Sequence, residues 1–133
     1  MSTAHVPQMQ DAKATNAIGL RTATNIMEKW GANQEQIAST LRISASTIAR
    51  AKANKQAAFK LDADQLDRIS YVLNIHAALR TLFENQENVY GFVAMPNQNT
   101  FFNGRTPLEI MAQGSFANLY ETYRHIDGLR GAL

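Results

Sequence analysis

The sequence predicts an all-α protein. Apolar residues recur at steps of three and four over most of the chain, and no segment shows the strict alternation of a half-buried strand. Helix-capping residues stand directly ahead of several of these stretches, at Asn33, Ser44, Asp62 and Ser115. These observations predict a series of helices joined by tight turns.

Length and composition limit the function classes. The chain has 133 residues, of which 45% are hydrophobic, so we expect one domain or two very small ones and little room for a multi-step enzyme. Cysteine is absent from the sequence, which excludes disulfides, zinc fingers and thiol chemistry and suits a reducing cytosol. No apolar run approaches the roughly 20 residues of a spanning helix. We therefore expect a cytoplasmic protein without membrane contact.

The N-terminal part predicts an arm followed by three helices. Residues 1–16 lack the basic start and apolar block of a secretory signal, and we expect them to form a flexible arm. A first helix is predicted from about Ala17 to Trp30, where Gly31 ends it. Its expected apolar face consists of Ile18, Ile26, Met27 and Trp30. Two shorter helices should follow, from Asn33 to about Leu41 and from about Ala45 to Lys55.

The segment QEQIASTLRISASTIARAKA, from Gln34 to Ala53, has the pattern of a helix-turn-helix. Two helices joined by a tight turn bury one small core when apolar or small residues occupy the facing positions. These positions are Ile37, Ala38, Leu41, Ile43, Ile48 and Ala51. Helix-turn-helix proteins usually have Gly in the turn, where this chain has Arg42, so we expect a strained or differently shaped turn.

Positive charge is concentrated on the same segment. No acidic residue lies between positions 42 and 60, whereas acids predominate from Asp62 onward. The basic residues of this stretch are Arg42, Arg50, Lys52, Lys55 and Lys60. Such clustering is typical of a surface that meets phosphates, and a solvated basic helix face is the alternative interpretation.

The second helix of the motif carries side chains suited to a DNA duplex. Arg50 can donate two parallel hydrogen bonds to guanine, while Ala45 and Ala49 permit close approach to the bases. Small hydroxyl donors and acceptors for phosphates or base edges are Ser44, Ser46 and Thr47. Gln34 would bind phosphate at the start of the preceding helix. Salt-sensitive affinity would come from Arg42, Lys52 and Lys55.

The C-terminal half predicts further helices. Asp62 and Gln65 form a capping-box pattern that begins a long amphipathic helix through about Glu84. A short helix should span 87–95, and the segment MPNQNTFFNGRTP should be a loop. Two more helices are predicted at about 107–113 and 116–127, with a flexible or partner-ordered tail, GLRGAL, after them.

A catalytic set is not evident. His5, His76 and His125 are scattered along the chain, and packing or capping explains each of them better than catalysis. The sequence contains no His-Glu-x-x-His metal motif and no phosphate loop. We therefore expect a protein that is not an enzyme and has no metal or cofactor.

The segment LRTLFENQENVYGFVAMPNQNTFFNGRTPLEIM, residues 79–111, resembles the toxin-binding region of the MbcA/ParS/Xre antitoxin family. The residues that match the family pattern are Leu82, Phe83, Pro96, Asn97, Gly104, Arg105, Thr106, Pro107 and Leu108. Many members have Trp-Leu before the Pro-Asn pair, whereas this chain has Phe92 and Val93 two residues further from it. The resemblance covers roughly residues 62–133.

The resemblance implies an antitoxin that blocks the active site of a RES-domain toxin, an enzyme that consumes NAD, and that dimerises on operator DNA to repress its own operon. The residues that it would place against the toxin are Asn97, Arg105, Leu129, Arg130, Gly131, Ala132 and Leu133. Arg105 should protrude toward the partner, because Gly104, Thr106 and Pro107 have structural duties in a helix-starting turn. Arg130 suits the pyrophosphate-binding pocket of an NAD-consuming enzyme.

The expected organisation is an arm at 1–16, a helix-turn-helix DNA-binding domain at 17–60, and a toxin-binding and dimerisation domain at 61–133. Two other interpretations remain. One is a stand-alone transcriptional regulator with a helical dimerisation domain. The other is a scaffold in which the first half serves packing alone.

Overall fold

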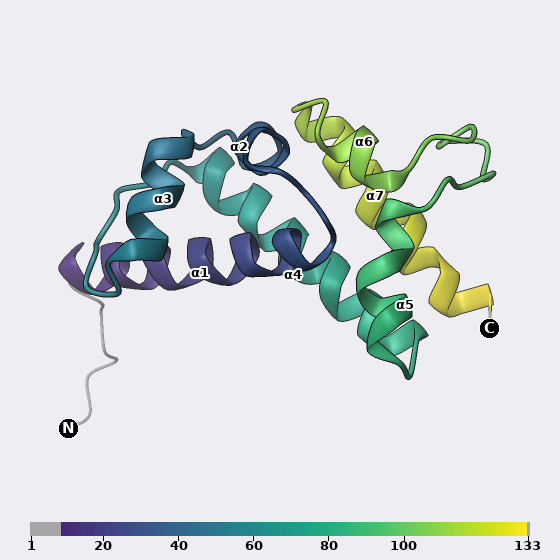
Figure 1. Ribbon diagram of the computed structural model, residues 1–133, viewed down its shortest axis with the longest axis horizontal. Coiled ribbons are helices and arrows are strands. Elements are labelled where there is room, and N and C mark those ends of the chain that lie inside the picture. Colours follow the sequence, from purple (N-terminus) through teal and green to yellow (C-terminus); the bar gives the residue numbers. More distant parts are fainter. Residues whose placement is uncertain (1–8, 133) are drawn as a thin grey trace, which may run out of the picture.

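The computed structural model describes residues 9–132 of the protein. All of its regular elements in that range are helical, which confirms the predicted all-α class. They are α1 Met9–Lys29, α2 Gln34–Leu41, α3 Ala45–Ala53, α4 Ala63–Leu82, α5 Gln86–Gly91, η1 Phe92–Ala94, α6 Pro107–Met111, α7 Phe116–Gly128 and η2 Leu129–Ala132, where η denotes a 3-10 helix. In Figure 1, α1 and α3 lie at one end of the molecule and α5, α6 and α7 at the other.

Helix α1 begins at Met9 rather than Ala17, so the predicted flexible arm is wrong for residues 9–16. The early turns are tied to the segment after α3. The backbone N–H of Phe59 donates to the Lys13 carbonyl over 3.2 Å, and Asn16 Nδ2 donates to the Phe59 carbonyl over 3.1 Å. These bonds explain the longer helix. Residues 1–8 lie outside the described range.

The apolar face of α1 also differs from the prediction at one position. Ile26, Met27 and Trp30 are buried as expected, whereas Ile18 is 57% exposed. Ala17 and Leu20 occupy the buried positions of that turn instead. The prediction chose Ile18 because it is the larger apolar side chain, whereas the small residue Ala17 beside it is the one that faces the core.

The helix-turn-helix forms as predicted in α2 and α3. Asn33 Oδ1 accepts from the Gln36 backbone N–H over 2.8 Å, and Gln36 Oε1 accepts from the Asn33 N–H over 2.9 Å, which completes a capping box. Ser44 caps α3 by accepting from the Thr47 N–H over 3.2 Å. Helix α3 ends at Ala53, short of the predicted Lys55, because the backbone of Asn54 is extended.

Helix α4 connects the two ends of the molecule, packing against α1 and along α7 (Figure 1). The predicted capping box at Asp62 and Gln65 is present, with bonds of 2.8 and 3.0 Å. Beyond α4 the predicted helix 87–95 is split into α5 and η1. The split falls at Gly91, a residue that weakens a helix interior.

The tail, predicted to be flexible or ordered by a partner, is helical in the chain itself up to Ala132. Residues 128–132 continue from α7 into η2, which packs against α4 and α7. An i,i+3 ion pair between Arg130 and Asp127 supports the transition from one helix to the next. Leu133 lies outside the described residues.

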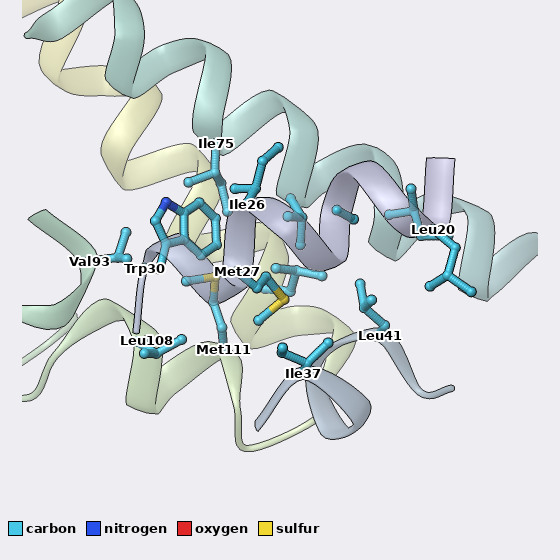
Figure 2. Close-up of a cluster of buried hydrophobic side chains, with 14 of the residues drawn as sticks. Leu20, Ile26, Met27, Trp30, Ile37, Leu41, Ile75, Val93, Leu108 and Met111 are labelled. Carbon is cyan, nitrogen blue, oxygen red and sulfur yellow. The ribbon is translucent and has the colours of Figure 1, made fainter. Parts of the chain in front are cut away.

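One hydrophobic core runs through both halves of the chain. Figure 2 shows Met27 and Trp30 of α1 surrounded by apolar side chains from four other elements. These side chains are Ile37 and Leu41 of α2, Ile75 of α4, Val93 of η1, and Leu108 and Met111 of α6. The helix-turn-helix and the C-terminal helices therefore stabilise each other.

Replacing Trp30, which is 1% exposed, with Ala should lower the free energy of unfolding by about 3–5 kcal/mol, because a large cavity opens where the two halves meet. Urea unfolding followed by circular dichroism measures this change. The matched control is Ile18→Ala, on an exposed position of the same helix, which should change stability by no more than about 0.5 kcal/mol. Similar values for the two variants would contradict the described core.

Candidate functional site

The outward face of α3 is accessible along its length. Ser44, Ala45, Ser46 and Arg50 are exposed and Thr47 is half-buried. Ile48 and Ala51 face inward and are buried. The division of the helix into a core face and a free face thus agrees with the sequence pattern, while a role of the free face in DNA binding stays a prediction.

The turn before α3 contains the left-handed residue that the motif requires. Arg42 has φ 56° and ψ 41°, a conformation that costs a non-glycine residue free energy. Its side chain offsets the cost by pairing with Asp62 and with Asp64, whose Oδ2 accepts from Nε over 2.7 Å. Gln65 Nε2 also donates to the Arg42 carbonyl over 2.9 Å. The Arg42 side chain is therefore directed toward the start of α4, whereas the sequence analysis predicted that it contributes affinity for a duplex.

These ion pairs shift the ionisation of the carboxyl groups. The hydrogen bond from Arg42 lowers the pKa of Asp62, and the Gln65 backbone N–H lowers it further. The pKa of Asp64 is lowered by Arg42 first and by Arg68 second. Both carboxylates therefore favour the charged form that holds the turn in place.

The other basic residues of the cluster differ in their surroundings. Lys52 forms an ion pair with Glu28 of α1, which offsets its charge. Lys55 and Lys60 are exposed in the segment that follows α3. Gln34 is the first residue of α2 and is exposed, so its side-chain amide N–H can donate to a phosphate at the start of α2.

A buried arginine, which the sequence analysis did not identify, joins the two halves. Arg68 is only 6% exposed. Its Nη1 donates to the Gly114 carbonyl over 2.8 Å and to the Thr40 carbonyl over 3.3 Å, while Nε donates to Asp64 over 2.9 Å. The available signal was its i,i+4 spacing from Asp64, within an otherwise apolar stripe. Arg68 thus links the end of α2 to the turn between α6 and α7.

The same junction is closely packed. Ser39 Oγ of α2 donates to the Ala112 carbonyl over 2.8 Å. Gly114 has φ +88°, and a Cβ at this position would lie 2.9 Å from Ser39 Oγ. Glycine is required here by both the backbone conformation and the close approach.

The loop between η1 and α6 holds itself together through its own backbone. The Asn97 N–H donates to the Arg105 carbonyl over 3.0 Å, and the Gly104 N–H donates to the Asn97 carbonyl over 2.8 Å. The Arg105 guanidinium donates to the carbonyls of Phe102 over 2.9 Å and Phe101 over 3.2 Å. Arg105 is exposed but does not protrude freely as predicted, because its side chain braces this loop.

The helix after the loop begins as the sequence predicts. Thr106 and Glu109 form a capping box, and Pro107 is the first residue of α6. Beyond α7, the predicted contact residues of η2 lie at the surface: Leu129 is half-buried, and Arg130 and Gly131 are exposed. Ala132 ends η2.

The histidines have packing roles where the structure describes them. His76 stacks on Tyr90 with ring centroids 5.5 Å apart, and burial, with Arg80 and Lys29 nearby, lowers the pKa of its imidazole. His125 stacks on Phe101 at 4.8 Å. His5 lies outside the described range. Among the described residues, no group of three or more His, Cys, Asp or Glu side chains could hold a metal ion. No helix among them is long and apolar enough to cross a bilayer.

Two family models match successive parts of the chain. The antitoxin Xre-like helix-turn-helix domain matches residues 9–74, and the antitoxin Xre/MbcA/ParS C-terminal toxin-binding domain matches residues 78–131. The chain belongs to the Xre/MbcA/ParS antitoxin family. This antitoxin therefore combines a helix-turn-helix domain with a toxin-binding domain, which is the architecture of a regulatory protein.

The two matched regions meet within α4, whereas we expected a boundary at residues 60 and 61. A curated relative, the uncharacterized protein y4oB of Sinorhizobium fredii (strain NBRC 101917 / NGR234), is 36% identical over 77 residues. The aligned region covers 58% of the antitoxin and 58% of the length of y4oB.

The ion pairs at the turn predict a dependence of stability on pH. Because the folded-state pKa of Asp64 is lowered, its pairing stabilises the fold above the unfolded-state value of about 3.9 and is lost as pH falls through the folded value. Asp64→Asn should therefore unfold at lower urea than the wild type at pH 6, and the difference should close toward pH 2. The control Asp67→Asn makes the same charge change at an exposed position of α4. A gap between Asp64→Asn and wild type that stayed constant from pH 6 to pH 2 would contradict the pairing.

Proposed function

We propose that this antitoxin neutralises a RES-domain toxin by covering its NAD-binding active site, and that it binds operator DNA as a homodimer to repress its own operon. The main support for the proposal is that one chain contains both a helix-turn-helix domain and a toxin-binding domain. Such a protein would act in the cytoplasm, where both its toxin and its operator are found. It would need no cofactor of its own.

The C-terminal surface supports the toxin-directed part of the proposal. Helix η2 presents Arg130 and Gly131 on the surface at the end of α7. A guanidinium in this position has the charge to enter a pocket that accepts pyrophosphate. The braced loop from residue 95 to 106 projects from the same end of the molecule (Figure 1). Asn97 and Arg105 would shape this loop as a second contact for the toxin.

The α3 surface supports the DNA-directed part. Its exposed residues are small or basic, as a helix that enters the major groove requires. Lys55 would contribute salt-sensitive attraction to the duplex, and Lys52 would contribute less because Glu28 offsets its charge. A homodimer would place two copies of α3 at half-sites about 34–36 Å apart, which is the usual arrangement for helix-turn-helix proteins.

Co-expression with the product of the neighbouring gene tests the proposal, followed by copurification and an assay of NAD consumption. The full chain should copurify with the neighbour and suppress NAD loss, and a chain truncated after Asp127 should release it. If no complex forms and the neighbour alone does not consume NAD, the toxin-directed part fails. Operator binding by the chain alone would then favour the stand-alone transcriptional regulator.

A matched pair of point variants tests the role of the tail. Arg130→Ala should weaken toxin binding by about tenfold or more, because a desolvated arginine anchor is lost from the interface. The control Arg124→Ala also breaks an exposed i,i+3 ion pair, on α7, and should change affinity by less than about threefold. Titration calorimetry with the purified toxin measures both values. Equal effects of the two substitutions would contradict a specific role for Arg130.

A further inference from the structure

Helix α3 has two different flanks. On one flank, the exposed residues Ala45, Ala49 and Lys52 border a shallow hollow that Gln34 of α2 and Glu28 of α1 also line. On the other flank, α3 and the segment before α4 enclose an open groove of about 400 Å³. The residues that line this groove are Ile43, Ser44, Thr47, Arg50, Ala58, Phe59, Lys60, Leu61 and Gln65. We call it the Arg50–Lys60 groove.

The structure holds Arg50 at the wall of this groove. Its guanidinium carbon lies 4.8 Å from the centre of the Phe59 ring, within the range of a cation–π contact. Phe59 itself is 5% exposed and is anchored by its backbone bonds to Lys13 and Asn16 of α1. Phe59 is therefore held in place, and its ring keeps the Arg50 guanidinium to one side of α3. The face of α3 that points directly away from the core carries Ser46 and Ala53.

The groove has the charge of an anion site. Arg50 and Lys60 both line it, and no carboxylate does. The nearest acids along the chain, Asp62 and Asp64, are paired with Arg42. The Thr47 hydroxyl accepts from Ser44 Oγ over 2.8 Å, which leaves its own proton for a further acceptor.

The position of the groove matches one strand of a duplex. A helix in the major groove, which is about 12 Å wide, has a phosphate backbone along each of its flanks. The N-terminus of α2 would lie along one backbone, and the Arg50–Lys60 groove lies on the other flank of α3. We propose that this groove binds a backbone phosphate of the second DNA strand, with Arg50 and Lys60 as its ligands and Phe59 as the positioning residue of Arg50.

This inference rests on the proposed DNA binding, and it changes the role that the sequence predicted for Arg50. As a phosphate ligand, Arg50 contributes affinity without selecting guanine. Base contacts then fall to the small residues Ala45, Ser46 and Ala49. Such contacts favour recognition through shape and close approach over bidentate hydrogen bonds.

Salt titrations of operator binding test the assignment, using the duplex upstream of the chain's own gene and single-base variants of it. Arg50→Ala should weaken binding to every duplex by the same factor and should reduce the slope of log K against log salt by about one. The change in affinity between 50 and 200 mM salt should therefore shrink by about 3.5-fold. Lys60→Ala should lower the affinity and the salt slope in the same way. Arg50→Lys should keep the slope of the wild type because lysine retains the positive charge.

The control Arg124→Ala removes one positive charge from α7 and should leave the slope unchanged. Relaxed discrimination at a single base pair in Arg50→Ala, with an unchanged slope, would show that Arg50 reads a base and would overturn the inference. Absence of duplex binding by the wild-type chain would instead overturn the proposed DNA binding, and this inference with it. The two failures are thus distinguishable.

A double-mutant cycle tests the positioning role of Phe59. Phe59→Leu keeps an apolar side chain in the buried position and removes the ring beneath Arg50. It should weaken duplex binding by about threefold to fivefold in the wild-type background, in line with an exposed cation–π contact, and should have no further effect in the Arg50→Ala background. A merely structural Phe59 would reduce binding equally in both backgrounds, which would overturn the positioning role.

Discussion

The burial of Trp30 at the meeting point of both halves is the constraint on which the remaining structure depends. Its side chain belongs to α1, yet it shares one core with η1 and α6 of the toxin-binding domain (Figure 2). Without those partners, a large apolar surface at the end of α1 would face water. The antitoxin therefore consists of two family domains but one hydrophobic core. This core fixes the direction of α3 relative to α6 and α7.

Polar contacts at the junction add orientation to this apolar attachment. Arg68 is buried, and its Nε and Nη1 donate to the Asp64 carboxylate and to the carbonyls of Thr40 in α2 and of Gly114 in the turn between α6 and α7. Burying a guanidinium is costly and the loss of these acceptors would raise that cost, so this arrangement tolerates little sliding of one half past the other. Asp64 also pairs with Arg42 in the helix-turn-helix turn. The position of that turn is thereby tied to the C-terminal helices.

Local signals predicted most of the fold, and tertiary contacts account for the rest. The capping residues Asn33, Asp62 and Thr106 each bond to a residue three positions further along the chain, so the sequence alone predicts where these helices start. The early start of α1 depends on bonds to Phe59, and the bracing role of Arg105 depends on carbonyls of its own loop. The ring beneath Arg50 and the partners of Arg68 come from distant segments. Apart from the i,i+4 spacing of Arg68 from Asp64, no spacing along the chain could have indicated these contacts.

Native-state hydrogen exchange tests the shared core most directly. If one core joins the two halves, the slowest backbone amides of α1, α4 and α7 should exchange with the same free energy of opening and the same dependence on denaturant, because all three are exposed only by global unfolding. Opening of α7 at a markedly lower free energy, with α1 still fully protected, would show two independent units. That result would contradict the single core on which this account is built.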